Sequence, residues 1–174
     1  KDPDYRVLDL SVNTFNDSYV SYHHKTIGGY SPAKMQRYQE LIDHCITPEI
    51  SSIAANLKSA TDLESAAEAI GYQPVLNMLN TRYIVINEQY PPLLNKGALG
   101  NAWFVRESRE ARNADEEMAL LKETDPAKCA VLSKEFYKEL PLGGTDSAAT
   151  IALDYYSPNR LIYNYSSSVP QMAL

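Results

Sequence analysis

Two alternating segments near the C-terminus constrain the fold more than any other part of the sequence. Residues 150–156 and 161–165 place apolar and polar side chains in turn, which is the pattern of strands with one buried face. Between them, Ser157-Pro158-Asn159-Arg160 has Ser and Pro where a type I turn favours them. We therefore expect a β-hairpin at this end of the chain.

Other apolar segments predict further strands. Residues 81–86 are rich in β-branched and aromatic side chains and continuous enough for a central, largely buried strand. Residues 5–10 alternate, and residues 102–105 and 129–132 are short and apolar enough for strands. Residues 11–30 show no sustained period, so we expect a long loop or an irregular strand there, a kind of segment that often carries function.

The clearest helix signal follows this loop. Ser31 and Pro32 supply an N-cap and a proline at the first helical position. Pro48 disfavours helical geometry in the residue before it, which predicts that the helix ends near Thr47. Helical spacing is kept between these limits by Met35, Tyr38, Leu41, Ile42, Cys45 and Ile46.

Shorter helices are predicted from their capping signals. Thr61 and Glu64 have the spacing of a capping box, and the helix they begin is closed by Gly71. Residues 74–80 fit one or two more helical turns. Residues 113–122 fit a further helix, which begins at an Asn with Glu three positions later.

These elements predict an α+β fold. The strands and helices cluster irregularly along the chain instead of alternating, which argues against a doubly wound sheet. We expect a mixed, mainly antiparallel sheet with three or four helices packed on it and the hairpin at the C-terminal end. A chain of 174 residues fits one soluble domain over residues 1–174.

Composition and the two ends narrow the class of protein. The net charge is −6 and no run of Lys and Arg interrupts it, so the chain has no positive field that would attract phosphate backbones. Nucleic acid is therefore not an expected partner.

The chain begins at Lys1 without Met and ends in an apolar segment that starts at Val169, so we expect a fragment of a longer polypeptide. Cys45 and Cys129 are either a disulfide pair or two buried thiols.

The residues predict no catalytic, metal or cofactor site. His23 and His24 are adjacent, and adjacent side chains of an extended segment point to opposite faces, which disfavours a shared metal ion. A cysteine nucleophile would need a histidine beside it. Cys45 adjoins His44 in the sequence, but consecutive helical residues do not face each other, which disfavours such a pair. A hydrolase would need a bound metal or a cleft with strongly perturbed carboxylates.

One group of residues has the composition of an anion site. Lys25, Gly28, Gly29 and Lys34 surround the expected start of the main helix, where backbone N–H groups and the helix dipole favour anions such as phosphate. The alternative is that the glycines make a tight turn into a capped helix. The thirteen tyrosines suit a sugar-stacking surface, although tyrosines also pack ordinarily with the hydroxyl outward.

Several segments in order resemble the extracytoplasmic region of the YfhO family of bacterial membrane proteins. They are residues 5–10, 14–17, 21–30, 34–39, 75–83 and 100–105, together with the hairpin turn at residues 156–161. The similarity extends over most of the chain, and no single segment is diagnostic.

The resemblance implies a role outside the cytoplasm. Members of the family are polytopic and resemble GT-C glycosyltransferases, which transfer sugars from polyprenyl-phosphate carriers to cell-envelope polymers. The domain would be non-catalytic and tethered by membrane helices, and the rest of the parent protein would be its partner. No catalytic residue can be carried over, because those of such enzymes lie near membrane helices.

A supporting role is what the resemblance implies for the loop before the main helix. This loop would contact the carrier's phosphate or an envelope glycan, through Tyr22, His23, His24, Lys25, Gly28, Gly29, Tyr30 and Lys34. The alternative function, from another class, is a free-standing carbohydrate-binding or scaffold domain with no transferase attached.

Overall fold

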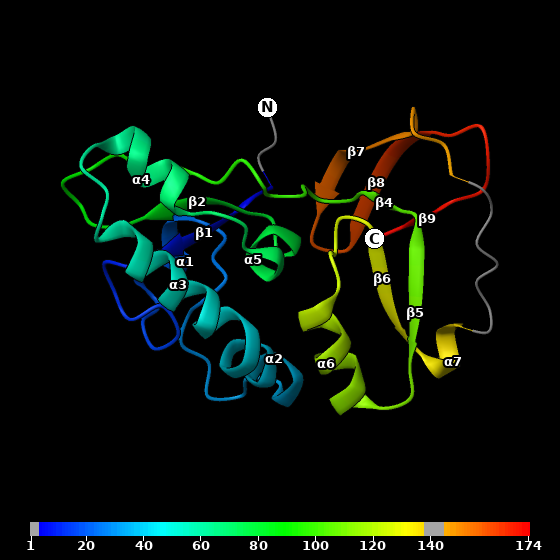
Figure 1. Ribbon diagram of the computed structural model, residues 1–174, viewed down its shortest axis with the longest axis horizontal. Coiled ribbons are helices and arrows are strands. Elements are labelled where there is room, and N and C mark those ends of the chain that lie inside the picture. Colours follow the sequence, from blue (N-terminus) through cyan, green and yellow to red (C-terminus); the bar gives the residue numbers. More distant parts are fainter. Residues whose placement is uncertain (1–3, 138–144) are drawn as a thin grey trace. The chain divides into compact units, whose positions relative to one another are not determined.

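The computed structural model describes residues 4–137 and 145–174 and has an α+β fold, as the sequence predicts. Contacts divide the chain into two compact units, residues 1–100 and 101–174 (Figure 1). Each is described separately below, and the expectation of one domain over residues 1–174 stays a prediction. Lys1, where the chain was expected to be cut from a longer polypeptide, lies outside the described residues.

The N-terminal unit contains a three-stranded mixed sheet. Its order is β1-β2-β3, with β1 parallel and β3 antiparallel to the central strand. Leu8, Ile84 and Leu93 lie side by side in register across the three strands, and all three are buried. The strands are β1 (Arg6–Asp9), β2 (Thr81–Val85) and β3 (Leu93–Leu94). The central strand predicted over residues 81–86 is therefore confirmed.

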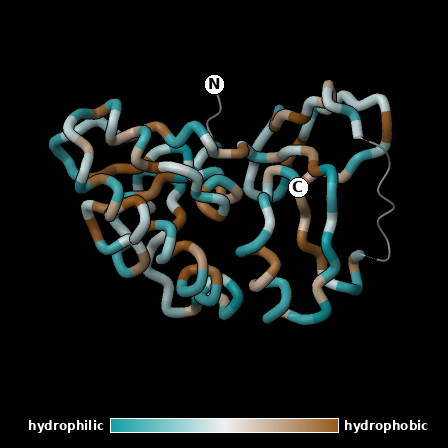
Figure 2. The backbone as a smooth tube through the Cα atoms, viewed as in Figure 1, coloured by the Kyte–Doolittle hydropathy of each residue, from teal (hydrophilic) through white to brown (hydrophobic). Residues whose placement is uncertain are grey.

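Helices cover this sheet. α4 packs against β3 and α3, and α5 packs against β2. Figure 2 shows hydrophobic stretches running through the interior of this unit. The helices are α1 (Tyr19–His23), α2 (Gln36–Leu41), the π-helix η1 (Ile42–Ile46), α3 (Thr47–Leu57), α4 (Leu63–Ala69) and α5 (Pro74–Met78).

The main helix differs from the sequence prediction at both ends. It begins at Gln36 with Met35 at the N-cap, so Ser31 caps no helix, and it runs through η1 into α3 as far as Leu57. In η1 the Thr47 N–H donates to the Ile42 carbonyl five residues back. In a regular α-helix the ring of Pro48 would clash with the backbone carbonyl four residues earlier. The wider π turn directly before Pro48 leaves space for this ring, so the helix continues.

The start of α4 shows a smaller correction. A capping box is present, but Asp62 and Ser65 form it, one residue beyond the predicted pair Thr61 and Glu64. The Asp62 carboxylate accepts a bond of 2.8 Å from the Ser65 N–H, which satisfies one free donor of the first turn. The helix ends as predicted, with Gly71 at a positive φ of 63° directly after it.

The second unit combines a β-α-β segment with the hairpin. β5 (Glu107–Ala111) and β6 (Cys129–Ser133) are parallel, and α6 (Ala114–Glu123) connects them and packs on both. β4 (Phe104–Val105) pairs with β9 (Met172–Ala173), and α7 (Lys134–Tyr137) follows β6. β6 and the Asn113 cap of α6 were predicted, whereas β5 was not.

The C-terminal hairpin is confirmed. β7 (Thr150–Ser157) and β8 (Arg160–Ser166) are antiparallel, and Ser157 pairs with Arg160 across the two-residue turn. A register shift between Leu153 and Tyr155 interrupts the ladder as a bulge.

Cys45 and Cys129 are buried thiols and form no disulfide. Within residues 4–137 and 145–174, no helix combines the length and the hydrophobicity required to cross a bilayer.

Candidate binding loop of the N-terminal unit

The structure places all eight predicted site residues on one continuous segment, residues 19–34, which we call the aromatic loop. Tyr22 and His23 lie on α1, and the following residue, His24, has the extended backbone of a strand. Thr26 then forms a parallel bridge with Val7 of β1. The loop is thus attached to the edge of the three-stranded sheet.

Backbone hydrogen bonds fix the middle of this loop. The Val7 N–H donates to the Lys25 carbonyl at 2.8 Å, and the Ile27 N–H donates to the Val7 carbonyl at 3.3 Å. Thr26 Oγ1 donates to the same Val7 carbonyl at 3.1 Å. Since Ile27 is also buried, this part of the loop is held by both main-chain bonds and the core.

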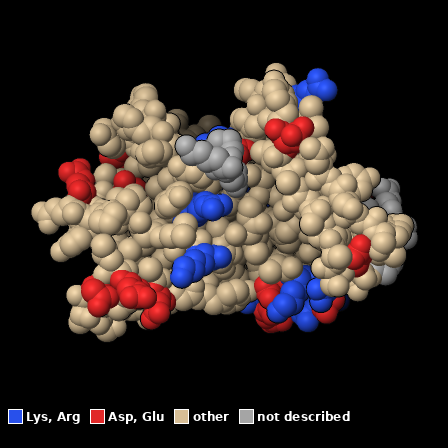
Figure 3. All heavy atoms as spheres, turned by 90° about the horizontal axis from the view of Figure 1, so that it is seen from above, with Lys and Arg blue, Asp and Glu red and all other residues tan. Residues whose placement is uncertain are grey.

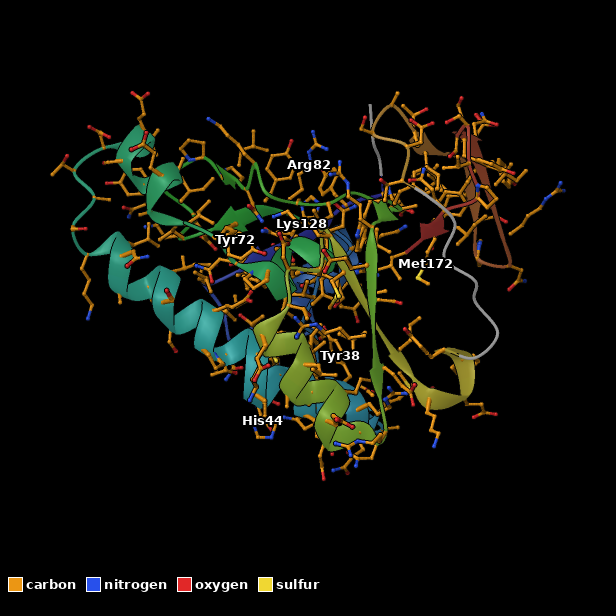
Figure 4. The ribbon with its side chains drawn as sticks, turned by 45° about the vertical axis from the view of Figure 1, so that its right-hand side comes forward. Tyr38, His44, Tyr72, Arg82, Lys128 and Met172 are labelled. Carbon is orange, nitrogen blue, oxygen red and sulfur yellow. The ribbon has the colours of Figure 1, made fainter. Side chains whose placement is uncertain are left out.

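Tyr38 fixes the loop from the main helix. Its hydroxyl donates to the Ile27 carbonyl, and burial raises the pKa of this phenol, opposed in part by the charge of Arg6. Figure 4 shows Tyr38 directed into the unit, whereas His44 lies exposed on the outside of the same helix. The sequence marked Tyr38 only as an apolar position, and helical spacing contains no signal for the hydroxyl's partner.

The two glycines make a close approach to an earlier segment. A Cβ at Gly28 would lie 2.7 Å from the carbonyl carbon of Thr14 and even closer to its oxygen, so only glycine fits. Gly29 has a positive φ of 110°. Their N–H groups bind within the chain: Gly28 donates to Thr26 Oγ1 at 3.1 Å and Gly29 donates to the Thr14 carbonyl at 2.8 Å.

The charged residues of the loop also have partners within the unit. Lys25 forms an ion pair with Asp4, whose side chain is mostly buried. Lys34 lies over the ring of Phe15, with Nζ 5.5 Å from its centroid, a cation–π contact. Since the main helix begins only at Gln36, its N-terminus adds no donors beside the glycines.

The tyrosines of the loop are largely exposed. Tyr22 is 83% exposed, Tyr19 63% and Tyr30 61%. Tyr19 also contacts the ring of His23, with centroids 5.0 Å apart. Sequence reasoning missed Tyr19, although Asp17 provides a start signal for α1 by accepting from the Tyr19 N–H at 2.6 Å.

A half-buried carboxylate elsewhere in this unit has a structural role. Burial raises the pKa of Glu49, although the N–H groups of Val75 and Leu76 donate to its oxygens at 2.8 and 2.9 Å. Both oxygens thereby satisfy the first turn of α5, so the carboxylate serves as a cap for a neighbouring helix.

No set of three or more His, Cys, Asp or Glu side chains suitable for a metal ion occurs in residues 4–137 and 145–174. Burial raises the pKa of the Cys129 thiol, which lowers its reactivity at neutral pH.

The surface charge is mixed. On the face drawn in Figure 3, Lys and Arg side chains do not merge into a continuous basic area, and acidic side chains lie on both units. Uncharged residues make up most of that face. The large or charged side chains that the aromatic loop exposes are those of Tyr19, Tyr22, Tyr30, His23, His24 and Lys25.

Comparison with known proteins gives no further assignment. No model of a protein family matches the chain, and no curated protein and no solved structure matches it either.

Proposed function

We propose that this chain is a non-catalytic, extracytoplasmic binding domain of a larger membrane protein, and that its aromatic loop binds a cell-envelope glycan. The observation that carries the proposal is the contrast within the loop. Three tyrosines are largely exposed, while the backbone beneath them is fixed to β1 and to Tyr38. Because the backbone is already fixed, ligand binding has to order only the side chains of these rings.

A glycan fits this loop better than a phosphate group. Aromatic rings stack on the apolar faces of sugars, and tyrosine adds a hydroxyl for polar contacts. A phosphate would need backbone donors, but the N–H groups of Gly28 and Gly29 already donate within the chain. Lys25 is likewise paired with Asp4, which reduces the charge available to an anion.

The membrane context of the proposal comes from the sequence resemblance to the YfhO family. In that context the parent protein would transfer sugars from polyprenyl-phosphate carriers, and this domain would hold the acceptor glycan outside the membrane. The rival is a free-standing carbohydrate-binding or scaffold domain, which the same loop would support. Hydrophobic spans of membrane length on both sides of this segment in the full gene favour the first, and their absence favours the second.

A binding assay tests the role of the loop. We expect the chain to bind envelope polysaccharide from a bacterial cell wall, measured by co-sedimentation and by microcalorimetry with soluble fragments. The double substitution Tyr22→Ala and Tyr30→Ala should weaken binding at least tenfold, since stacking supplies most of the contact. Tyr90→Ala is the matched control, because Tyr90 is also exposed but lies outside the loop.

The same assay separates glycan from phosphate recognition. Lys25→Ala with Lys34→Ala should change the affinity for neutral glycan less than the tyrosine double variant does. Binding of a polyprenyl-phosphate sugar analogue that depends on the lysines and not on the tyrosines would contradict the proposal. So would equal affinity of the tyrosine double variant and the Tyr90→Ala control.

A further inference from the structure

The N-terminal unit contains a pocket of about 210 Å³ between α4 and residues 94–97. One wall is the face of α4 that carries Glu64 and Glu68, and the other carries Lys96 and Gly97. Ile70 and Leu94 add apolar surface to the lining, and Ile70 is buried. The pocket shares no residue with the aromatic loop, so it is a separate feature of the unit.

The charged side chains of this pocket are not committed to partners. Within residues 4–137 and 145–174, Glu64, Glu68 and Lys96 make no ion pair and no side-chain hydrogen bond. Glu64 and Glu68 are one helical turn apart on the same face, where like charges repel each other. A cationic group between the two carboxylates would relieve this repulsion.

Hydrogen bonds within the chain hold both walls of the pocket in place without a ligand. Asn95 is buried, and its Nδ2 donates to Asn77 Oδ1 at 2.8 Å and to the Thr81 carbonyl at 2.9 Å. Its Oδ1 accepts from the Gly97 N–H at 3.0 Å, which sets the path of the chain around Lys96. On the other wall, the capping box of Asp62 and Ser65 holds the start of α4.

We propose that this pocket binds a small ligand with a primary ammonium group beside oxygen atoms, the chemistry shared by amino sugars and α-amino acids. The two carboxylates of α4 bind the ammonium group, and Lys96 on the opposite wall donates to the oxygen atoms. The pocket is smaller than the roughly 300–1,000 Å³ typical of sites for drug-sized ligands, so it takes one monosaccharide or one amino acid. This site is independent of the function proposed for the aromatic loop.

Titration of the ¹⁵N-labelled chain followed by NMR tests the site. Millimolar glucosamine or glycine should shift the backbone amide signals of Gly71 and Gly97, which flank the pocket, at concentrations where glucose and glucuronate leave them unchanged. A response to glucosamine alone identifies the amino-sugar class, and a response to glycine alone identifies the amino-acid class. Equal shifts with glucose, or shifts with glucuronate alone, overturn the proposal.

Variants show whether the carboxylates carry the binding. Glu64→Gln with Glu68→Gln should weaken binding of the responding amine at least tenfold, and Ala67→Leu should block it by filling the pocket. Glu88→Gln removes one carboxylate at an exposed position that does not line the pocket and should leave binding unchanged. Far-UV circular dichroism confirms that each variant is folded, and unaltered affinity of the folded double variant refutes the assignment.

Discussion

The carboxylate of Glu49 on α3 accepts a hydrogen bond of 2.8 Å from the backbone N–H of Val75 in the first turn of α5. Its second oxygen accepts from the Leu76 N–H at 2.9 Å. α5 begins with Pro74, which has no N–H, and Gln73 at its N-cap makes no side-chain capping bond. One side chain from a distant helix therefore satisfies the donors that a local cap would otherwise bind.

Glu49→Gln should lower the free energy of unfolding by about 1–2 kcal/mol, because an amide has only one oxygen to accept from two N–H groups. Urea denaturation at neutral pH, followed by far-UV circular dichroism, measures this loss. Glu88→Gln, at an exposed position, should leave the urea midpoint within error. A loss of similar size in both variants would show that the charge, and not the cap, is responsible.

The contribution of Glu49 to the free energy of unfolding also depends on pH. Burial raises the pKa of Glu49 above its usual 4.5, so the folded state binds a proton at higher pH than the unfolded state does. The contribution of this group to stability therefore increases as the pH falls from neutral through the raised pKa toward 4.5. The difference in unfolding free energy between the native protein and Glu49→Gln should grow over that range, and a shrinking difference would contradict this.

Gly28→Ala should destabilise the N-terminal unit by about 1–3 kcal/mol and should weaken glycan binding. A Cβ at this position would meet the backbone carbonyl of Thr14, which cannot move without breaking its bond from the Gly29 N–H. The urea midpoint and the polysaccharide assay measure the two effects. A stable variant with normal binding would show that the loop adapts and that its fixed backbone is unimportant.

Ser31→Ala is the control for this substitution. Ser31 is exposed and precedes the true start of the main helix by several residues, so the change should be neutral. If Ser31 did cap that helix, as the local sequence suggested, its removal would cost about 1 kcal/mol.

Local signals predicted the elements whose stabilising contacts are also local. The hairpin of β7 and β8 follows from alternation and from a turn with Pro158 at its second position. The Asn113 cap of α6 follows from its position relative to Glu116, whose N–H it binds at 2.9 Å. In both cases the deciding interactions join residues that are close in the sequence.

The main helix shows where a local rule failed. Pro48 should have ended it, but Ile46 before the proline and Ile53 after it are both completely buried. Burying both side chains requires the chain to continue in one direction, and the π turn of η1 makes that compatible with Pro48. Tertiary packing outweighed the backbone preference of a single residue.

β5 could not have been found from its own sequence. Its residues, from Glu107 to Ala111, are mostly charged or small and lack the alternation of a strand. The strand exists because it pairs with β6, which was predicted, in parallel register from Glu107 with Cys129 to Ala111 with Ser133. The contacts that hold the aromatic loop could not be found from local sequence either. The Val7–Thr26 bridge and the hydrogen bond from Tyr38 to Ile27 each join separate segments of the chain.

Glu116→Gln should remove part of the acid sensitivity of the second unit, where bonds from Ser168 and Ala148 also lower the pKa of Asp146. Arg112 donates to this carboxylate through Nη2 at 2.8 Å, through Nε at 2.9 Å and through its backbone N–H at 2.8 Å. These bonds lower the pKa of Glu116 from 4.5 to about 2. Because the folded-state pKa is depressed, the ionised group contributes stability that is present above about pH 4.5 and lost as the pH falls toward 2.

The fluorescence of Trp103 reports this effect, since it is the only tryptophan and belongs to the second unit. Urea midpoints of the native protein and of Glu116→Gln should converge between pH 4.5 and pH 2, and those of an exposed control, Glu123→Gln, should stay parallel to the native curve. Convergence in both variants would show that general charge repulsion causes the acid sensitivity.

Thr81→Val should leave stability unchanged or raise it by up to about 1 kcal/mol. Thr81 is fully buried on β2, and its Oγ1 has no hydrogen-bond partner among the described residues. A buried hydroxyl without a partner loses its bonds to water and gains nothing in return, whereas valine has nearly the same shape and favours a strand. Thr26→Val is the matched comparison in the same unit. Thr26 Oγ1 donates to the Val7 carbonyl at 3.1 Å and accepts from the Gly28 N–H, so the loss of this hydroxyl should cost about 1 kcal/mol or more.

Urea denaturation of both variants measures the two changes in the free energy of unfolding. If Thr81→Val destabilised the protein as much as Thr26→Val, an ordered water would satisfy the Thr81 hydroxyl in solution, which contradicts the prediction.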